Sequence, residues 1–184
     1  KINKGSELTM IQYTIDNSQD SFIRNTQDNV LIDDNADLKS IFIQKSKSSG
    51  HFYRYTHVSL EDNSNYQNFT LTSGLKFNKS EIEINLNKDN GNCSVLSALN
   101  ISGHEHQEIK TRINHYAPNC ESYQKIKNVV HENGKGVYQG KIFVKNIAQK
   151  TNAYQLSKAL ILNNSAEFDA KPELEIYADD VKCS

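Results

Sequence analysis

The chain has 184 residues, and its 21 Lys and Arg nearly balance its 22 Asp and Glu, which gives a formal net charge of −1 at neutral pH. Hydrophobic residues make up 36% of the chain, but 9 Tyr and 7 Phe argue against disorder and favour a folded domain with a polar exterior. The balanced charge argues against a nucleic-acid-binding arm, and no apolar run approaches the roughly 20 residues that span a membrane. We expect a single domain over residues 1–184.

Short segments rich in β-branched and aromatic residues recur along the chain, separated by polar turns. Most of them alternate apolar and polar residues with the period of two that is typical of a strand with one buried face. The sequence is therefore predicted to be all-β. In chain order, we predict strands at Ser40–Gln44, Phe69–Thr72, Glu81–Leu86, Ile109–Ile113, Tyr123–Val130, Lys141–Val144, Lys158–Leu162 and Glu173–Tyr177.

The connections between these segments distinguish a sandwich of hairpins from a solenoid of stacked parallel strands. Asn90-Gly91 and Asn133-Gly134 are the clear cases of a tight two-residue hairpin sequence. The other connections are irregular and draw on the 22 Asn of the chain. Asn tolerates the left-handed backbone conformation that the corners of a coiled β structure require. The turn chemistry therefore favours the solenoid.

Three cysteines, Cys93, Cys120 and Cys183, lie far apart in the sequence and form no CxxC pair. Such a sparse and odd-numbered set predicts neither a disulfide framework nor a zinc ribbon. We expect a reducing compartment, the bacterial cytoplasm, in which each thiol either packs as a small apolar group or is kept for its chemistry.

The most distinctive run lies at the end of the chain, from Lys171 to Ser184, and reads KPELEIYADDVKCS. Two further segments precede it, GVYQGKI at residues 136–142 and AQKT at residues 148–151. Together these segments resemble the core of the SufB/SufD family of the SUF iron-sulfur cluster assembly system. The ending VKCS is more similar to the SufD branch than to the SufB branch. The first hundred residues resemble the family mainly in their strand pattern.

This resemblance implies a right-handed parallel β-helix, flanked in the intact protein by helical regions that we expect to be mostly absent from this chain. It also implies a non-catalytic scaffold subunit that pairs with a SufB-like subunit through its C-terminal coils. A SufC-like ATPase would bind through the C-terminal helical region, beyond Ser184. We expect this chain to bind no cofactor stably, an iron-sulfur cluster to be held transiently in the full complex, and the isolated chain to form a homodimer.

Cys183 is the main candidate site residue. Alternation places Leu174 and Ile176 on the interior face of the last strand, and after a corner it places Val181 and Cys183 on one inward face. Alternation alone leaves a packed core cysteine as the simpler interpretation. The resemblance implies instead that Cys183 takes part in cluster assembly or sulfur transfer, since a soft thiolate is a natural ligand for iron or persulfide sulfur.

His104 and His106 are a second and weaker candidate, as a pair of ligands for zinc or iron, with His115 and Cys120 further along the chain. If the segment is a strand, the two imidazoles lie on one face about 7 Å apart. No third or fourth ligand is shown to converge on them. Two solvated imidazoles are therefore the simpler interpretation.

Two other functions are compatible with a β-helix. The first is a carbohydrate-active enzyme, for which paired carboxylates are required. Candidates are Asp169, Glu173, Glu175, Asp179 and Asp180, although solvated faces and corners explain them more simply and the chain has no Trp. The second is a purely structural homodimeric solenoid. No P-loop or dinucleotide-binding fingerprint is present, so any nucleotide chemistry must come from a partner.

Overall fold

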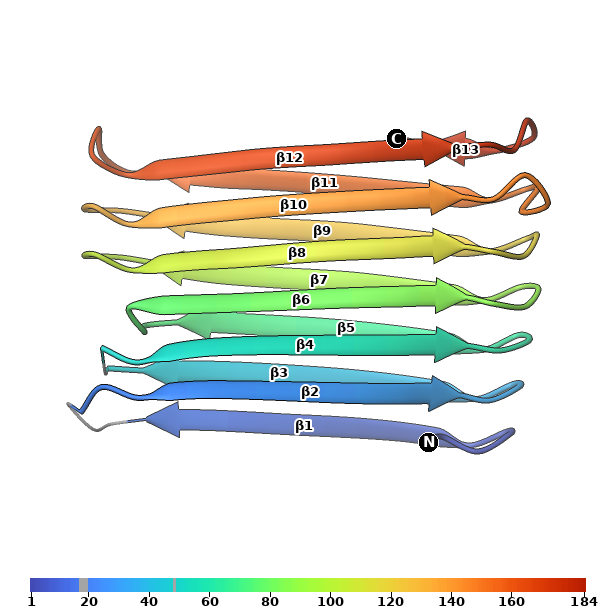
Figure 1. Cartoon of the computed structure of the whole chain (residues 1–184), viewed down its shortest axis with the longest axis horizontal. Coiled ribbons are helices and arrows are strands. Elements are labelled where there is room, and N and C mark those ends of the chain that lie inside the picture. The colour runs from blue at the N-terminus through green and yellow to red at the C-terminus, as the bar shows by residue number, and fades with distance from the viewer. Residues whose placement is uncertain (17–19, 48) are drawn as a thin grey trace.

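The computed structural model describes residues 1–16, 20–47 and 49–184, and these contain thirteen β-strands and no helix. The even-numbered strands run from left to right at the front of Figure 1, the odd-numbered strands return behind them, and the chain climbs one level per turn. The coil is therefore right-handed, and the predicted all-β parallel β-helix is confirmed. The strands are β1 (Glu7–Asp16), β2 (Ile23–Ile32), β3 (Asp37–Ser46), β4 (His51–Leu60), β5 (Asn65–Ser73), β6 (Phe77–Leu86), β7 (Asn92–Ile101), β8 (His106–His115), β9 (Glu121–Val130), β10 (Lys135–Val144), β11 (Asn152–Ile161), β12 (Glu167–Ile176) and β13 (Lys182–Cys183).

Two parallel sheets form the walls of the solenoid. The odd-numbered strands make a seven-stranded sheet in the order β1-β3-β5-β7-β9-β11-β13, and the even-numbered strands make a six-stranded sheet in the order β12-β10-β8-β6-β4-β2. In the register of the six-stranded sheet, one turn takes from 26 residues, between His51 and Phe77, to 32 residues, between Lys135 and Glu167. Because the coils differ in length, the sequence shows no strict repeat.

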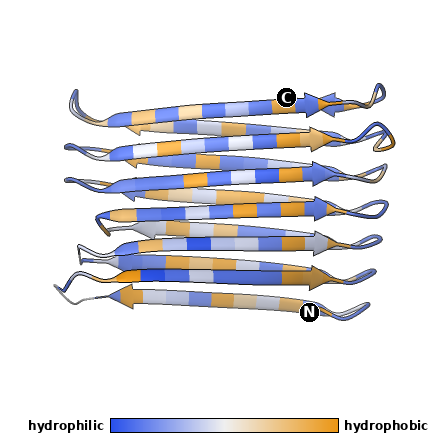
Figure 2. Ribbon diagram, in the orientation of Figure 1, coloured by the Kyte–Doolittle hydropathy of each residue, from blue (hydrophilic) through white to orange (hydrophobic). Residues whose placement is uncertain are grey.

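Alternate residues of each strand fill the interior of the solenoid. In β6, Ile82, Ile84 and Leu86 are buried between the sheets, whereas Glu81 and Glu83 face outward. Hydrophilic and hydrophobic bands alternate along the front strands in Figure 2. The period of two that predicted the strands is thus the alternation between exterior and core.

Asparagines form a ladder at one corner of the solenoid. Four successive coils turn from the six-stranded to the seven-stranded sheet on an Asn whose φ lies between 52° and 59°: Asn35, Asn63, Asn90 and Asn119. The backbone amide of each of these residues donates to a backbone carbonyl of the next coil, for example Asn35 to Asp62 at 2.9 Å and Asn119 to Gln149 at 2.9 Å. Asn adopts this left-handed conformation at lower cost than most residues that carry a Cβ. The predicted role of Asn at the corners is confirmed.

Polar side chains in the interior connect the two sheets. Thr72 Oγ1 of β5 donates to Gln107 Oε1 of β8 at 2.6 Å. Within the six-stranded sheet, the buried guanidinium of Arg54 of β4 donates to Asp28 of β2 at 3.0 Å and forms an ion pair with it. Buried polar groups that find partners in this way avoid the cost of desolvation without compensation.

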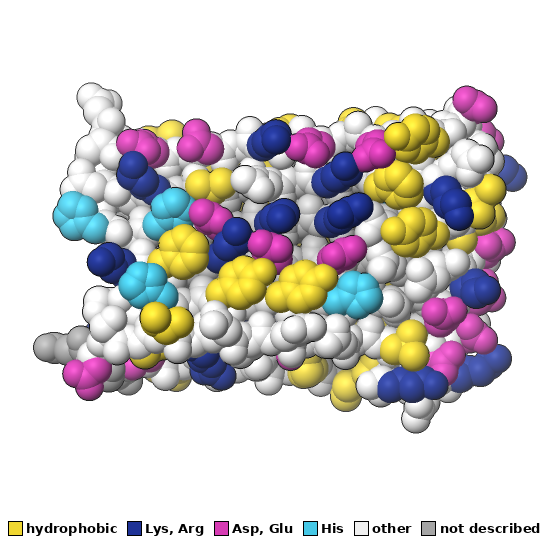
Figure 3. Space-filling view, in the orientation of Figure 1, with side chains coloured by type: hydrophobic (Ala, Val, Ile, Leu, Met, Phe, Trp, Pro, Cys, Tyr) yellow, Lys and Arg dark blue, Asp and Glu magenta, His cyan; other side chains and the backbone are white. Residues whose placement is uncertain are grey.

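Acidic and basic side chains lie side by side on the outer face of the six-stranded sheet, which faces the viewer in Figure 3. Lys79 lies 3.2 Å from Glu81 and 3.3 Å from Glu108, and Lys110 lies 3.6 Å from Glu81. Exposed pairs of this kind add little stability, but they give the face a balanced charge. No helix in the described part of the chain could span a membrane.

Candidate functional site at the C-terminal end of the solenoid

No further coil of the described residues covers the C-terminal end of the solenoid, which is called the open end below. Leu174 and Ile176 of β12 point toward the interior, in register with the buried Ile142 and Val144 of β10. No further coil of the described residues covers them, so they remain 47% and 38% exposed. The sequence correctly predicts the direction of these side chains, and their place in the last coil explains why they are not buried.

Cys183 lies on the inner side of this open end. It belongs to β13 and pairs with Ala153 of β11. The side chains of Val181 and Cys183 pack against a small apolar cluster, consisting of Ile142, Val144, Ala148, Ala153 and Ala178. Cys183 is half-buried, whereas Cys93 and Cys120 are fully buried. The inward orientation predicted for Val181 and Cys183 is confirmed.

The environment of Cys183 favours the protonated thiol. Burial raises its pKa, and a hydrogen bond with the backbone of Ala153 opposes this shift. The thiolate is the form that binds soft metals and attacks sulfur. A ligand at this site must therefore displace a proton, which makes binding dependent on pH.

The free edges of the two sheets differ at this end. The amide of Gln155 donates to the carbonyl of Ser184 at 2.8 Å, and beyond that residue no described strand pairs with the outer edge of β11. The backbone amides of Glu167 and Tyr177 donate to the carbonyls of Gly134 and Val144 in the preceding coil, so the even-numbered positions of β12 direct their backbone groups to the free edge. Pro172 occupies one of these positions and has no N–H to offer. The edge of β11 is therefore the better template for an added strand.

His115 and Cys120 lie inside the solenoid, away from the other candidate ligands. His115 Nε2 lies 2.9 Å from Ser122 Oγ, and burial lowers the pKa of His115 to about 4. Cys120 donates from Sγ to the carbonyl of Lys88 at 3.3 Å, and burial raises its pKa to about 11. Sequence reasoning missed Ser122 as the partner of His115. The signal that could have identified this contact is the alternation of each strand, which places both His115 and Ser122 on the inner side.

The expectation that His104 and His106 share a strand face is wrong. β8 begins at His106, and His104 lies in the preceding turn. Both residues line a hollow of about 330 Å³ together with Phe77, and His106 Nε2 lies 2.8 Å from Glu108 Oε1. His115 stands at the opposite end of β8, about 30 Å away along the strand. Among the described residues, no three His, Cys, Asp or Glu are placed to hold a metal ion.

The carboxylates of the last long strand face outward and form ion pairs with lysines. Glu173 lies 3.0 Å from Lys171, and Glu175 lies 2.5 Å from Lys141. The hydrogen bonds from these lysines lower the pKa of both carboxyl groups. Glycoside hydrolysis needs a general acid whose pKa is raised, so the two carboxylates lack that feature. Residues 179–180 form the corner before β13, as the sequence predicts.

One protein-family model matches the whole chain. Residues 1–184 match the model described as "SUF system FeS cluster assembly, SufBD core domain". The chain belongs to this family. The resemblance carried by the run from Lys171 to Ser184 is thereby confirmed, and it extends through the first hundred residues, where the strand pattern was the main sequence signal.

Three curated relatives support the same family at modest identity. Protein ABCI7, chloroplastic, from Arabidopsis thaliana is 29% identical over 187 residues, which cover 100% of this chain and 39% of the relative. The iron-sulfur cluster assembly SufBD family protein slr0076 of Synechocystis sp. is 26% identical over 166 residues, covering 90% of this chain and 37% of the relative. The iron-sulfur cluster assembly protein SufD of Escherichia coli is 26% identical over 181 residues, covering 98% and 43%. The chain thus spans about two fifths of the length of these relatives.

Proposed function

We propose that this chain forms the β-helix core of a non-catalytic scaffold subunit in a SUF-type iron-sulfur cluster assembly complex of the bacterial cytoplasm. The observation that carries the proposal is the match of all 184 residues to the SufBD core domain. The similarity to a protein named SufD supports the same role. Iron and sulfide are cargo in this proposal, and the cluster is held only while it is assembled.

The open C-terminal end supports pairing with a SufB-like subunit. Leu174 and Ile176 expose apolar surface that a second β-helix stacked on this end would bury, and β11 offers a free edge. Burial of apolar surface and extension of a sheet both favour association. A second copy of this chain carries the same features, so the isolated chain is expected to form a homodimer. The SufC-like ATPase would supply the nucleotide chemistry for which this chain has no P-loop.

Cys183 would then lie at the boundary between the two subunits. Its thiol is half-buried among apolar side chains at the open end, so an approaching subunit would exclude water from it. Exclusion of water protects a soft-ligand site from competing thiols until the interface rearranges. A basic group or a metal ion supplied by the partner would favour the thiolate, because either one stabilises the negative charge.

The proposal is tested by co-expression of this chain with SufB-like and SufC-like subunits and purification under anaerobic conditions. We expect a stable complex that gains iron and sulfide. The Cys183→Ser variant should still join the complex but should hold less iron and sulfide. The matched control is Cys120→Ser, which removes a buried thiol from another part of the core and retains a donor for the carbonyl of Lys88.

Each part of the proposal has its own contrary result. Failure of the folded chain to associate with the SufB-like subunit would contradict the scaffold role. An unchanged content of iron and sulfide in Cys183→Ser would contradict the role of this thiol. For the isolated chain, light scattering at micromolar concentration should report a dimer, which Ile176→Asp disrupts, and a monomeric wild type would contradict pairing of two copies.

A further inference from the structure

The outer faces of the two sheets differ in a way that the proposed function does not use. On the six-stranded sheet, β6 alternates strictly, with Glu81 and Glu83 facing outward. On the seven-stranded sheet, β3 places Ile41 and Ile43 outward on either side of the buried Phe42. Strands that are apolar on both sides are typical of parallel sheets covered by protein on both faces. Around Phe42, β3 therefore has the sequence pattern of a strand that is covered on both faces.

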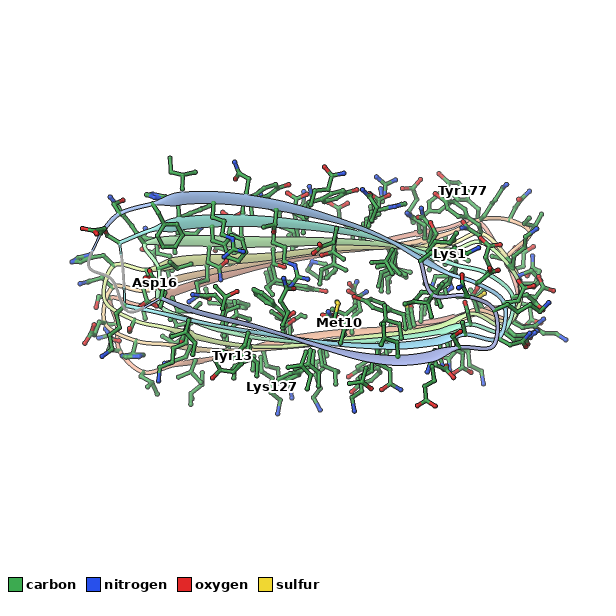
Figure 4. All side chains as sticks on the ribbon, turned by 90° about the horizontal axis from the view of Figure 1, so that it is seen from below. Lys1, Met10, Tyr13, Asp16, Lys127 and Tyr177 are labelled. Carbon is green, nitrogen blue, oxygen red and sulfur yellow. The ribbon has the colours of Figure 1, made fainter. Side chains whose placement is uncertain are left out.

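Six apolar side chains form a patch on this outer face, in two rows across β1, β3 and β5. The register aligns Ile11, Ile41 and Phe69 in one row and Tyr13, Ile43 and Leu71 in the other. In the end-on view of Figure 4, Tyr13 projects outward from the sheet, whereas Met10 points into the solenoid. Ile11 is 65% exposed and Tyr13 is 57% exposed. Contiguous apolar surface of this kind marks an interaction site.

Three lysines, called the lysine cluster below, lie toward the far end of the same two rows. Leu96 and Ala98 of β7 continue the rows, Lys125 and Lys127 follow on β9, and the rows end on β11 with Leu156 and Lys158. These three lysines have no ion-pair partner in the described part of the chain. In the four outward rows that begin with residues 9, 11, 13 and 15 of β1, the described strands of this sheet carry no Asp or Glu. The lysines of these four rows therefore have no carboxylate within the rows, and the outward Glu7, Asp37 and Glu121 lie together in the row that begins the strands.

We propose that this face docks an amphipathic α-helix of a partner polypeptide, with its apolar side chains on the patch and its carboxylates on the lysine cluster. Five strand spacings separate β1 from β11, which is roughly 24 Å. A helix that follows the rows over this distance needs about 16 residues. Such a helix buries the apolar surface and supplies the carboxylates that these four rows lack. Charge complementarity of this type also fixes the direction in which the helix docks.

Two other occupants fit the face less well. A second copy of this chain would present the same rows without carboxylates, so it would leave the lysines unneutralised. An anionic lipid surface would neutralise them, but the apolar residues lie on a regular sheet face. Ile41 and Ile43 flank the buried Phe42, which is the two-sided pattern of a strand packed between layers of protein.

The test uses two fluorescein-labelled peptides of 16 residues, designed as helices with the same leucine stripe. In one peptide, glutamates flank the part of the stripe that would meet the lysine cluster, and in the other, lysines replace them. Fluorescence anisotropy should show at least tenfold tighter binding of the glutamate peptide, and its affinity should fall when NaCl rises from 50 to 500 mM. Leu71→Glu should weaken binding of the glutamate peptide at least tenfold. Lys127→Glu should weaken binding of that peptide and strengthen binding of the lysine peptide.

Gln139→Glu is the matched control, because Gln139 is exposed on the outer face of the other sheet. This substitution should leave the affinities for both peptides unchanged. Circular dichroism and thermal melting confirm that each variant is folded. Equal affinities for the two peptides, or no binding of either, would overturn the proposal. So would self-association that Leu71→Glu abolishes, which would assign the face to a second copy. Sedimentation with vesicles of phosphatidylcholine and phosphatidylglycerol that depends on Leu71 and Lys127 would assign it to a membrane instead.

Discussion

Acidification should destabilise this domain through His115, whose side chain is fully buried between the two sheets. Burial lowers the pKa of His115 from 6.5 to about 4, because the charged imidazole would lose its hydration. Below pH 6.5 the unfolded chain therefore binds a proton that the folded chain does not bind. The stability that is present above pH 6.5 is lost as the pH falls toward about 4, the pKa of His115 in the folded chain. Between pH 7.5 and pH 4.5, these two pKa values correspond to a loss of roughly 2–3 kcal/mol.

The assay is urea denaturation of the wild type and of His115→Gln at a series of pH values between 7.5 and 4.5. The amide of Gln can still hydrogen-bond to Ser122 but does not titrate, so the wild type should lose roughly 2–3 kcal/mol more than the variant across this range. Carboxylates contribute equally to both proteins and cancel in the difference. His104→Gln, at an exposed turn, should behave as the wild type. An identical dependence on pH in His115→Gln and the wild type would refute the argument.

Two further predictions concern the corners and the thiols. Asn63→Ala should destabilise the domain by about 1 kcal/mol, or roughly 2–4 °C in Tm, because Asn63 has a φ of 52°, which Ala adopts at a higher cost. The control Asn133→Ala changes a corner residue without a positive φ and should change Tm little. Equal losses of Tm in the two variants would contradict this prediction. Alkylation of the native chain by iodoacetamide, followed by mass spectrometry, should label Cys183 before the fully buried Cys93 and Cys120. The rate of labelling of Cys183 should continue to rise above pH 8.5, because burial raises the pKa of this thiol. Labelling of Cys120 at the same rate as Cys183 would contradict the prediction.

Much of the fold could be predicted because the solenoid imposes simple local rules. In Glu81–Leu86, the alternation of charged and aliphatic residues gives both the strand and the face that is buried. At the corners, a left-handed residue is needed in every coil, and Asn is the residue with a side chain that meets this need most readily. These are properties of single segments, so they can be recognised without knowledge of the partner strand.

Strands with a polar interior were harder to predict. β2 has the sequence IRNTQDNVLI and places Arg24, Thr26 and Asp28 on its inner side, so apolar residues do not alternate along most of it. The structure compensates for one of these polar groups across two coils, because the buried Arg54 forms an ion pair with Asp28. Arg54 and Asp28 are 26 residues apart in the sequence, and the length of a coil varies along the chain. The sequence alone therefore does not give the register that aligns the two side chains. Local patterns carry no information about such pairs.

The same limit applied to the candidate site, where alternation gave the direction of Cys183 but not its surroundings. Its neighbours Val181 and Ala153 also face the interior, and no further coil of the described residues covers the thiol at the open end. A single thiolate does not fill the coordination shell of an iron ion, and no group of three His, Cys, Asp or Glu is assembled in the described residues. In the proposed scaffold, the SufB-like subunit that covers this end would supply the further ligands. The geometry of Cys183 therefore favours a site completed by a partner over a site contained in this chain, which is the arrangement that a scaffold subunit requires.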